Sequence, residues 1–242
     1  MRVFEGRAAD IDADRERSRE LFEHTAETGE PTVRAWTPPR QVAFGRRDTR
    51  AAGYERARAI AAEQDFPPVE REVGGRAVAY TGSTVAFART EPAEGREIQQ
   101  RYARATTDLQ VAFHRLGVRA RAGEPPESFC PGSHSLQADG KIAGLAQRVT
   151  GDAALVAGIV VTRDAGAMAG VLEPIYDALD VTFDPDSVGS LSRAGSDADP
   201  GTVAHTIGEA LAEGYRGANG RSADEPAVDE PAADEPTDDR EA

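Results

Sequence analysis

Apolar and polar residues follow two different periods along this chain, so the sequence predicts a mixture of strands and helices. Short segments rich in valine, threonine and aromatic residues predict strands, and the continuous apolar run over 154–161 predicts a fully buried one. Longer alanine-rich segments predict helices. Strands are expected at 32–36, 41–44, 69–73, 77–80, 84–88, 118–121, 135–138, 141–149 and 154–161. Helices are expected at 14–27, 49–64, 96–116 and 167–179, with a last one starting at Pro200.

Turn residues support this order of elements. Asp139-Gly140 predicts a two-residue hairpin turn, because both central positions of such a turn need positive φ. Gly117 is expected to end the longest helix, and Thr49 is expected to cap the second one. Hairpins mixed with helices predict an α+β fold: a single domain with a central mixed, largely antiparallel sheet flanked by helices.

The chain divides into a body over 1–217 and an acidic tail over 218–242. Asp-Glu-Pro recurs in the tail at Asp224, Asp229 and Asp234, and the tail holds nine acidic residues and two arginines. It has too few apolar residues to bury a core, so we expect it to be disordered. A docking arm is the alternative to a tail that only aids solubility.

Charge and cysteine content exclude several classes of protein. The net charge of −14 argues against nucleic-acid binding, which needs a basic surface. A single cysteine excludes an internal disulfide and a cysteine-cluster metal site. The sequence has no apolar run of transmembrane length and its N-terminus does not resemble a secretory signal, so a cytoplasmic protein without a membrane partner is expected.

Two residues that each occur once lie close together in the sequence. Lys141 is the one lysine among 28 basic residues, and Cys130 is the one cysteine. A lysine ammonium can stabilise a nearby thiolate, which is the nucleophilic form of cysteine. Cys130 precedes Pro131, so its backbone is expected to be extended within a loop. The alternative is that the lysine survived by chance and that the cysteine only fills the core.

Three neighbouring features could complete a site. His134, four residues after Cys130, is a candidate base, although a loop histidine is more often merely exposed. In the strand 141–149, Lys141 and Gln147 are expected on one face, and Gly144 and Ala146 on the other, where small residues leave room for a ligand. The segment REVGGRAV offers backbone amides around a double glycine, or it is an ordinary turn. Its candidate binding residues are Arg71, Gly74, Gly75, Arg76, Ala77 and Val78.

These motifs, in this order, resemble the catalytic domain shared by lipoate–protein ligases, octanoyltransferases and biotin ligases. The resemblance covers about 26–216 and includes Arg34, Trp36, the segment 44–48, REVGGRAV and DGKIAGLAQR. It implies a fold like that of class II synthetases. The motif Phe-Cys-Pro-Gly-Ser at 129–133 resembles the amidotransferase branch, which moves an octanoyl group from the glycine-cleavage H protein to lipoyl domains of 2-oxoacid dehydrogenases.

The resemblance implies a cysteine acyltransferase. Cys130 would form a thioester with an octanoyl or lipoyl group, and Lys141 would stabilise the thiolate and the acyl oxygen. The double-glycine loop, Gly144, Ala146 and Gln147 would bind the acyl group, without a metal or another cofactor. An ATP-dependent lipoate–protein ligase, in which Cys130 is incidental, is the first alternative. A non-catalytic protein that binds lipoyl domains is the second.

Overall fold

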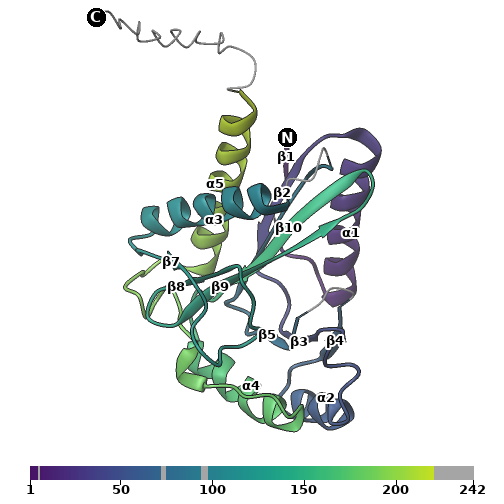
Figure 1. Ribbon diagram of the computed structural model, residues 1–242, viewed down its shortest axis with the longest axis vertical. Coiled ribbons are helices and arrows are strands. Elements are labelled where there is room, and N and C mark those ends of the chain that lie inside the picture. The colour runs from purple at the N-terminus through teal and green to yellow at the C-terminus, as the bar shows by residue number, and fades with distance from the viewer. Residues whose placement is uncertain (5, 72–74, 94–97, 221–242) are drawn as a thin grey trace, which may run out of the picture.

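A mixed seven-stranded sheet forms the centre of the fold (Figure 1). The computed structural model describes residues 1–4, 6–71, 75–93 and 98–220. Within this sheet β1 runs parallel to β2, and the other neighbouring strands are antiparallel. In order across the sheet, the strands are β1 (Arg2–Phe4), β2 (Thr32–Trp36), β6 (Val85–Pro92), β10 (Ala153–Val160), β9 (Lys141–Val149), β8 (Ser135–Gln137) and β7 (Arg121–Ala122).

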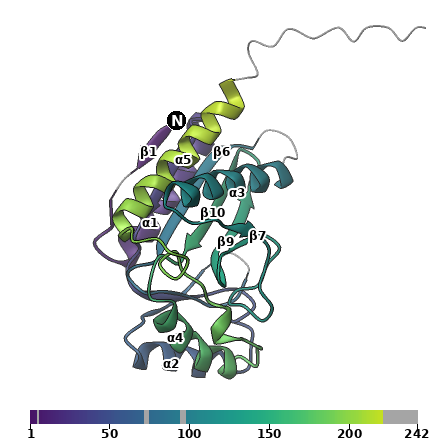
Figure 2. The same ribbon diagram turned by 90° about the vertical axis from the view of Figure 1, so that its left-hand side faces the viewer.

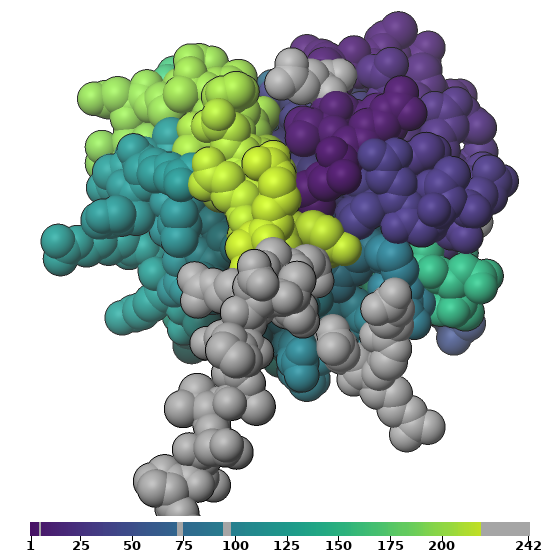
Figure 3. Space-filling model, turned by 90° about the horizontal axis from the view of Figure 1, so that it is seen from above, coloured from purple at the N-terminus to yellow at the C-terminus, as the bar shows by residue number. Residues whose placement is uncertain are grey.

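Alternation along the strands gives the large sheet two different faces. One face carries large apolar side chains such as Phe87 and packs against α3 (Ile98–Arg115) and α5 (Pro200–Gly220). Figure 2 shows both helices on this side, and Figure 3 shows the yellow α5 between the purple N-terminal segment and teal residues from the middle of the chain. Part of the opposite face is covered by α1 (Ile11–Thr28), through a hydrogen bond between Thr25 and Thr90.

A smaller lobe lies beside the large sheet, at the bottom of Figure 1. Its three-stranded sheet contains β4 (Pro68–Glu70), β3 (Gln41–Phe44) and β5 (Val78–Tyr80), in that order. The helices α2 (Tyr54–Glu63) and α4 (Ala165–Ala178) pack on it, followed by a short 3-10 helix, η1 (Pro185–Ser187). The strands β2 and β3 follow each other in sequence but belong to different sheets, so the chain crosses between the two parts at 37–40.

Buried ion pairs join the large sheet to α3. Arg89 donates to Asp108 at 2.6 Å, and Arg101 donates to Glu91 at 2.7 Å, with both arginines only 1% exposed. Burial raises the pKa of Asp108, while the charge of Arg89 opposes that rise. Breaking such a pair by removing one partner destabilises a protein by about 3–5 kcal/mol. These arginines therefore have a structural role.

The elements expected from the sequence are largely present. The strands at 32–36, 41–44 and 141–149 have the expected bounds, and Asp139 and Gly140 have φ of +51° and +101° in the hairpin turn. The expected cap at Thr49 is wrong: α2 begins at Tyr54, and the Thr49 hydroxyl donates to the Arg46 carbonyl within a turn. The last helix extends to Gly220, past the expected boundary at 217. The rest of the acidic tail, 221–242, and the expected start of the third helix at Arg96 lie outside the described residues.

Candidate active site

The loop before β8 holds Cys130 in an uncommon backbone conformation. Cys130 has φ of +42°, in the left-handed region that costs a residue with a side chain about 1–2 kcal/mol. The expected extended conformation before Pro131 is therefore wrong. Two hydrogen bonds override it: the Tyr176 hydroxyl accepts from the Cys130 N–H at 2.6 Å, and the Lys141 ammonium donates to the Cys130 carbonyl at 3.0 Å.

Lys141 lies against this loop and is buried, with 1% of its surface exposed. Its ammonium donates to the Glu124 carboxylate at 2.8 Å and to the carbonyl oxygens of Phe129 and Cys130 at 2.9 Å and 3.0 Å. Burial lowers the pKa of Lys141, and the hydrogen bond to Glu124 opposes this change. The structure thus brings the lysine to the cysteine loop, but the hydrogen bonds of the ammonium go to the backbone of the loop and not to the sulfur.

The cation that donates to the Cys130 sulfur is Arg71. Its guanidinium donates to Sγ at 3.3 Å, and the backbone N–H of Arg76 donates to the same atom at 3.4 Å. A Cβ at Gly75 would lie 2.8 Å from Sγ, so only glycine allows this approach. Burial lowers the pKa of Arg71, but its interactions with Cys130 and Tyr80 outweigh burial and hold that pKa above its ordinary value. Arg71 therefore remains a cation beside the thiol.

Tyr176 on α4 connects the two loops of the site. Its hydroxyl accepts from the Cys130 N–H and donates to the carbonyl of Ala77 at 3.0 Å. Burial raises the pKa of the Tyr176 phenol, so it acts as a neutral donor. One side chain thus holds the cysteine loop and the double-glycine loop in a fixed relation.

Replacing Tyr176 by phenylalanine is expected to loosen the cysteine loop. The ring still fills its place, but the Cys130 N–H and the Ala77 carbonyl lose their partner, and an unsatisfied buried polar group costs about 1–3 kcal/mol. Urea unfolding should show a stability loss of that size, and limited proteolysis should cut 123–134 faster. Tyr54→Phe is the matched control, because it removes a hydroxyl whose partner, Glu70, is exposed. Equal effects of the two substitutions would contradict this role of Tyr176.

Alanine and glycine residues form a strip on the face of the large sheet that points away from α3 and α5. In one row Gly144 stands opposite Ile159, and Ile159 stands opposite Ala86. The next row has Ala146 opposite Ala157, and Ala157 opposite Ala88. The small-residue strip consists of Ala86, Ala88, Gly144, Ala146 and Ala157.

The small-residue strip begins at the cysteine loop and is open to solvent over part of its length. A Cβ at Gly144 would lie 3.4 Å from Cε of Lys141. Ala146 is exposed and Ala157 is half-buried. At the other end, the Arg34 guanidinium lies 3.8 Å from the centre of the Trp36 ring, beside Ala86 and Ala88. The strip therefore offers an apolar surface between the thiol loop and an arginine–tryptophan pair.

The position of Lys141 corrects the expected faces of β9, whereas Gly144, Ala146 and Gln147 keep the faces expected for them. A shift in register between Leu136 and Gln137 interrupts the alternation near Lys141, so Gly144 points toward the Lys141 side chain. Gln147 lies two residues beyond Leu145, which packs on the α3 and α5 side, so alternation places Gln147 on the face away from the strip.

The remaining candidates divide into those near the thiol and those away from it. The His134 ring stacks on Tyr102 of α3, with centroids 3.5 Å apart, and none of its described contacts involves Cys130. Burial lowers the pKa of His134. Ala77 and Val78 are buried in the core of the small lobe, where Ala77 contributes its carbonyl. Gly74 lies outside the described residues.

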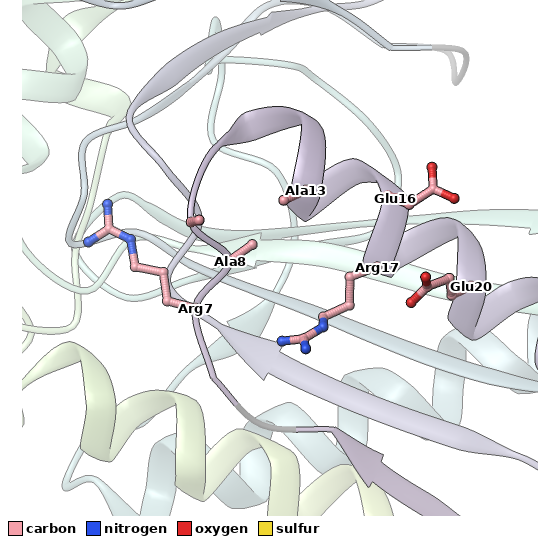
Figure 4. A pocket seen from close by; sticks show the side chains of 7 residues that line it. Arg7, Ala8, Ala13, Glu16, Arg17 and Glu20 are labelled. Atoms are coloured by element: carbon pink, nitrogen blue, oxygen red, sulfur yellow. The ribbon is translucent and has the colours of Figure 1, made fainter.

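Two solvent-open hollows lie elsewhere on the described surface, and neither contains a candidate site residue. The first, of about 380 Å³, lies at the start of α1 between Arg7, Arg17 and acidic side chains (Figure 4). The second, of about 530 Å³, lies beside β7 and the hairpin turn.

Among the described residues, no group of three or more histidine, cysteine or acidic side chains could hold a metal ion. No helix in that part of the chain is long and apolar enough to cross a bilayer.

Sequence reasoning missed Glu124 and Tyr176 and misjudged the partner of the sulfur. A buried lysine needs a carboxylate partner, so the glutamates of 123–127 were a usable signal for Glu124. Arg71 was expected to bind substrate, and its contact with the thiol depends on how two distant loops pack. Nothing in the sequence pattern around Tyr176 indicates its hydrogen bonds.

Comparison with known proteins gives a consistent result. Residues 15–212 match the model of the lipoyl protein ligase A/B catalytic domain. An octanoyl-[GcvH]:protein N-octanoyltransferase from an Exiguobacterium species is 31% identical over 160 residues, which are 65% of this chain and 57% of that protein. A lipoyl-[GcvH]:protein N-lipoyltransferase from Listeria monocytogenes is 29% identical over 48% of this chain and 43% of that protein. The chain thus spans about half the length of these relatives.

Solved structures support the fold. A lipoate-protein ligase A bound with ATP has a TM-score of 0.72 at 16% identity, covering 89% of this chain and 85% of that one. A putative lipoate protein ligase from T. acidophilum with bound lipoic acid has a TM-score of 0.64 at 17% identity, covering 90% and 85%. These similarities confirm the expected architecture of a mixed sheet flanked by helices.

Proposed function

Because this chain belongs to the lipoyl protein ligase A/B catalytic domain family, we propose that it transfers an octanoyl or lipoyl group to a protein lysine through a thioester on Cys130. The observation that carries the proposal is the half-buried thiol with two donors aimed at its sulfur, Arg71 and the Arg76 N–H. Relatives of this chain are named as octanoyl and lipoyl transferases, which supports acyl transfer over other chemistry.

The proposed reaction exchanges one acyl bond for another in two steps. The Cys130 thiolate attacks the acyl carbonyl carbon of the donor amide, a C–S bond forms, and the C–N bond breaks after the leaving amine takes up a proton. The ε-amine of the acceptor lysine then attacks the thioester carbon, the C–S bond breaks, and the thiolate is restored as the new amide nitrogen loses a proton. Because each step consumes one acyl bond and forms another, the reaction needs no ATP.

Arg71 and Lys141 have different parts in this mechanism. The Arg71 guanidinium offsets the negative charge of the attacking and leaving sulfur. Lys141 is a positioning residue, because its hydrogen bonds to two consecutive carbonyls hold the loop that aims the sulfur. The sequence analysis expected Lys141 itself to stabilise the thiolate. In this proposal Arg71 supplies the positive charge next to the sulfur, and Lys141 positions the loop.

The small-residue strip is the proposed place for the acyl chain. It starts beside Lys141 and lacks side chains larger than a methyl group in the two rows that cross β6, β10 and β9, apart from Ile159. Burying the six methylenes of an octanoyl chain stabilises binding by roughly 5 kcal/mol. The carboxylate partner of Arg34, Asp14, keeps that arginine at the far end. The strip therefore fits a saturated chain or a lipoyl ring without polar recognition.

The proposed protein partners follow from the names of the relatives. Several are named for the H protein, GcvH. We propose the acylated H protein as the donor and lipoyl domains of 2-oxoacid dehydrogenases as acceptors. No metal or other cofactor takes part in the proposed reaction.

Replacing Arg71 by methionine is expected to slow acylation of Cys130 on the order of tenfold to a hundredfold, because a charge-assisted hydrogen bond contributes about 1.5–3 kcal/mol. Iodoacetamide alkylation of Cys130 at pH 7 should slow as well. The measurement is the single-turnover acylation rate followed by intact mass. Arg71→Lys keeps the charge without the planar fork and should retain an intermediate rate. Normal acylation of the methionine variant would remove Arg71 from the mechanism.

The test of the proposed function uses the purified protein with octanoylated H protein and no ATP. We expect an octanoyl adduct on the intact protein, located on the peptide that contains Cys130, and transfer of that group to an unmodified lipoyl domain. Acyl-dependent pyrophosphate exchange without an adduct would instead indicate an ATP-dependent ligase. Retained binding of lipoyl domains with neither signal would indicate a non-catalytic binder.

A further inference from the structure

The turn after β3 carries three exposed arginines that have no partner among the described residues. Arg46, Arg47 and Arg50 are exposed, and no hydrogen bond, ion pair or ring contact joins their side chains to any other residue described in the structure. The buried arginines, such as Arg34 and Arg89, are instead matched with carboxylates. On a protein with a net charge of −14, this arginine turn, defined as 45–50, is a local positive surface.

The arginine turn is held rigidly by Asp48, the one acid within it. Asp48 is buried, and its carboxylate accepts from the Gly45 N–H at 3.0 Å and from the Arg76 guanidinium at 3.2 Å. The Thr49 hydroxyl donates to the Arg46 carbonyl at 3.2 Å. Because its one negative charge is turned inward and paired, the turn presents only positive charge to solvent.

This turn also lies at the edge of the candidate active site. A Cβ at Gly45 would lie 2.2 Å from the Gly75 carbonyl oxygen, and a Cβ at Gly75 would lie 2.8 Å from the Cys130 sulfur. Two successive close backbone contacts thus connect the turn to the thiol. A macromolecule docked on these arginines would therefore lie close to the loop that holds Cys130.

We propose that the arginine turn is a docking surface for an acidic carrier-protein domain, which it holds by carboxylates around the domain's modified lysine. The inference rests on the proposed acyl transfer, because that function requires a protein donor and a protein acceptor at the thiol. Complementary charge mainly accelerates association and selects partners. The net negative charge of the protein repels an acidic partner from the rest of its surface. The arginine turn therefore favours the orientation in which the partner's carboxylates face it.

The distribution of the arginines favours a protein surface over a small anion. Their side chains are exposed, and no contact among the described residues joins them into one closed site. An extended surface of carboxylates can contact all three at once. Attraction of this kind acts over a Debye length, about 8 Å at physiological ionic strength.

The test compares two triple variants that change the net charge equally. Arg46→Glu/Arg47→Glu/Arg50→Glu alters the turn, and Arg115→Glu/Arg119→Glu/Arg216→Glu is the control, at exposed positions in α3, just after it and in α5. Binding of unmodified H protein and of an isolated lipoyl domain is measured by calorimetry in a Cys130→Ala background. Acylation of Cys130 by an uncharged small thioester, octanoyl-N-acetylcysteamine, is measured with Cys130 present.

We expect the turn variant to bind both proteins on the order of tenfold more weakly than the control, with unchanged acylation by the small thioester. Wild-type binding should weaken as salt rises from about 0.01 M to about 1 M, where the Debye length falls from about 30 Å to about 3 Å. Equal binding by the two variants, or no wild-type binding of either protein, would overturn the proposal. So would slower acylation by the small thioester in the turn variant, since the arginines would then act in the chemistry.

These measurements distinguish failure of the docking surface from failure of the proposed acyl transfer. If no donor acylates the wild-type protein but the turn variant still binds carrier domains more weakly, the proposed function fails and the docking surface stands. If octanoyl-coenzyme A loses affinity for the turn variant while both proteins bind normally, the arginines recognise phosphate and the proposal is wrong.

Discussion

Cys130→Ala is expected to abolish acyl transfer and to leave the protein folded. The proposed reaction stores the acyl group on Cys130 Sγ, and the described active site has no second thiol or activated hydroxyl that could replace it. Alanine keeps the backbone hydrogen bonds to Tyr176 and Lys141, so the loop should hold its shape. The measurement is transfer of octanoyl from H protein to a lipoyl domain, with intact mass to follow the enzyme.

Cys130→Ser is the matched variant for this experiment. Its hydroxyl is nearly isosteric with the thiol but is a weak nucleophile without a base, and the described contacts of His134 place that ring against Tyr102 instead. We therefore expect no acyl transfer from the serine variant as well. Transfer at a wild-type rate by either variant would show that the acyl group does not pass through Cys130.

Lys141→Arg is expected to lower acyl transfer by at least about a hundredfold, even though it keeps the positive charge. The ammonium donates to one carboxylate and two carbonyls, and the residue is only 1% exposed. A planar guanidinium does not match that arrangement of acceptors. The mismatch should cost about 1–3 kcal/mol of stability by overpacking. The measurements are urea unfolding and the single-turnover acylation rate.

Two further variants separate charge from shape at Lys141. Lys141→Met leaves Glu124 and two carbonyls without their donor, and removing one partner of a buried pair costs about 3–5 kcal/mol. Glu124→Gln keeps a hydrogen-bond acceptor for the ammonium and should cost less. If Lys141→Arg transferred acyl groups normally, the lysine would have no positioning role and the loop would be held by Tyr176 alone.

The local sequence pattern was sufficient to predict the hairpin and most of the helices and strands around the site. Asp-Gly favours a two-residue turn with positive φ at both positions, so β8 and β9 were predictable together with the position of Lys141 at the start of β9. That hairpin allowed this lysine to reach the cysteine loop, and the hydrogen bonds of the ammonium to Phe129 and Cys130 confirm that it does. The separation of β2 and β3 into different sheets did not follow, because it depends on packing that neighbouring residues do not encode.

The residue that donates to the Cys130 sulfur could not be predicted from the sequence pattern. Arg71 and Cys130 are 59 residues apart, and their contact depends on the fold of the double-glycine loop against the cysteine loop. The backbone of Cys130 was also misjudged, because the local preference before Pro131 gives way to hydrogen bonds from Tyr176 and Lys141. The face of Lys141 was misassigned for a similar reason: one irregularity in the ladder between β8 and β9 puts Lys141 on the same side as Gly144.

The burial of Lys141 has a consequence for the proposed thioester on Cys130. Lys141 is the one ε-amine in the sequence, and its three hydrogen bonds to Glu124 and the loop carbonyls occupy it fully. The described surface therefore presents no lysine that the chain could modify on itself. Amine-reactive reagents added to a mixture with a carrier protein should accordingly label the carrier's lysines, which makes the modified position on the partner directly readable.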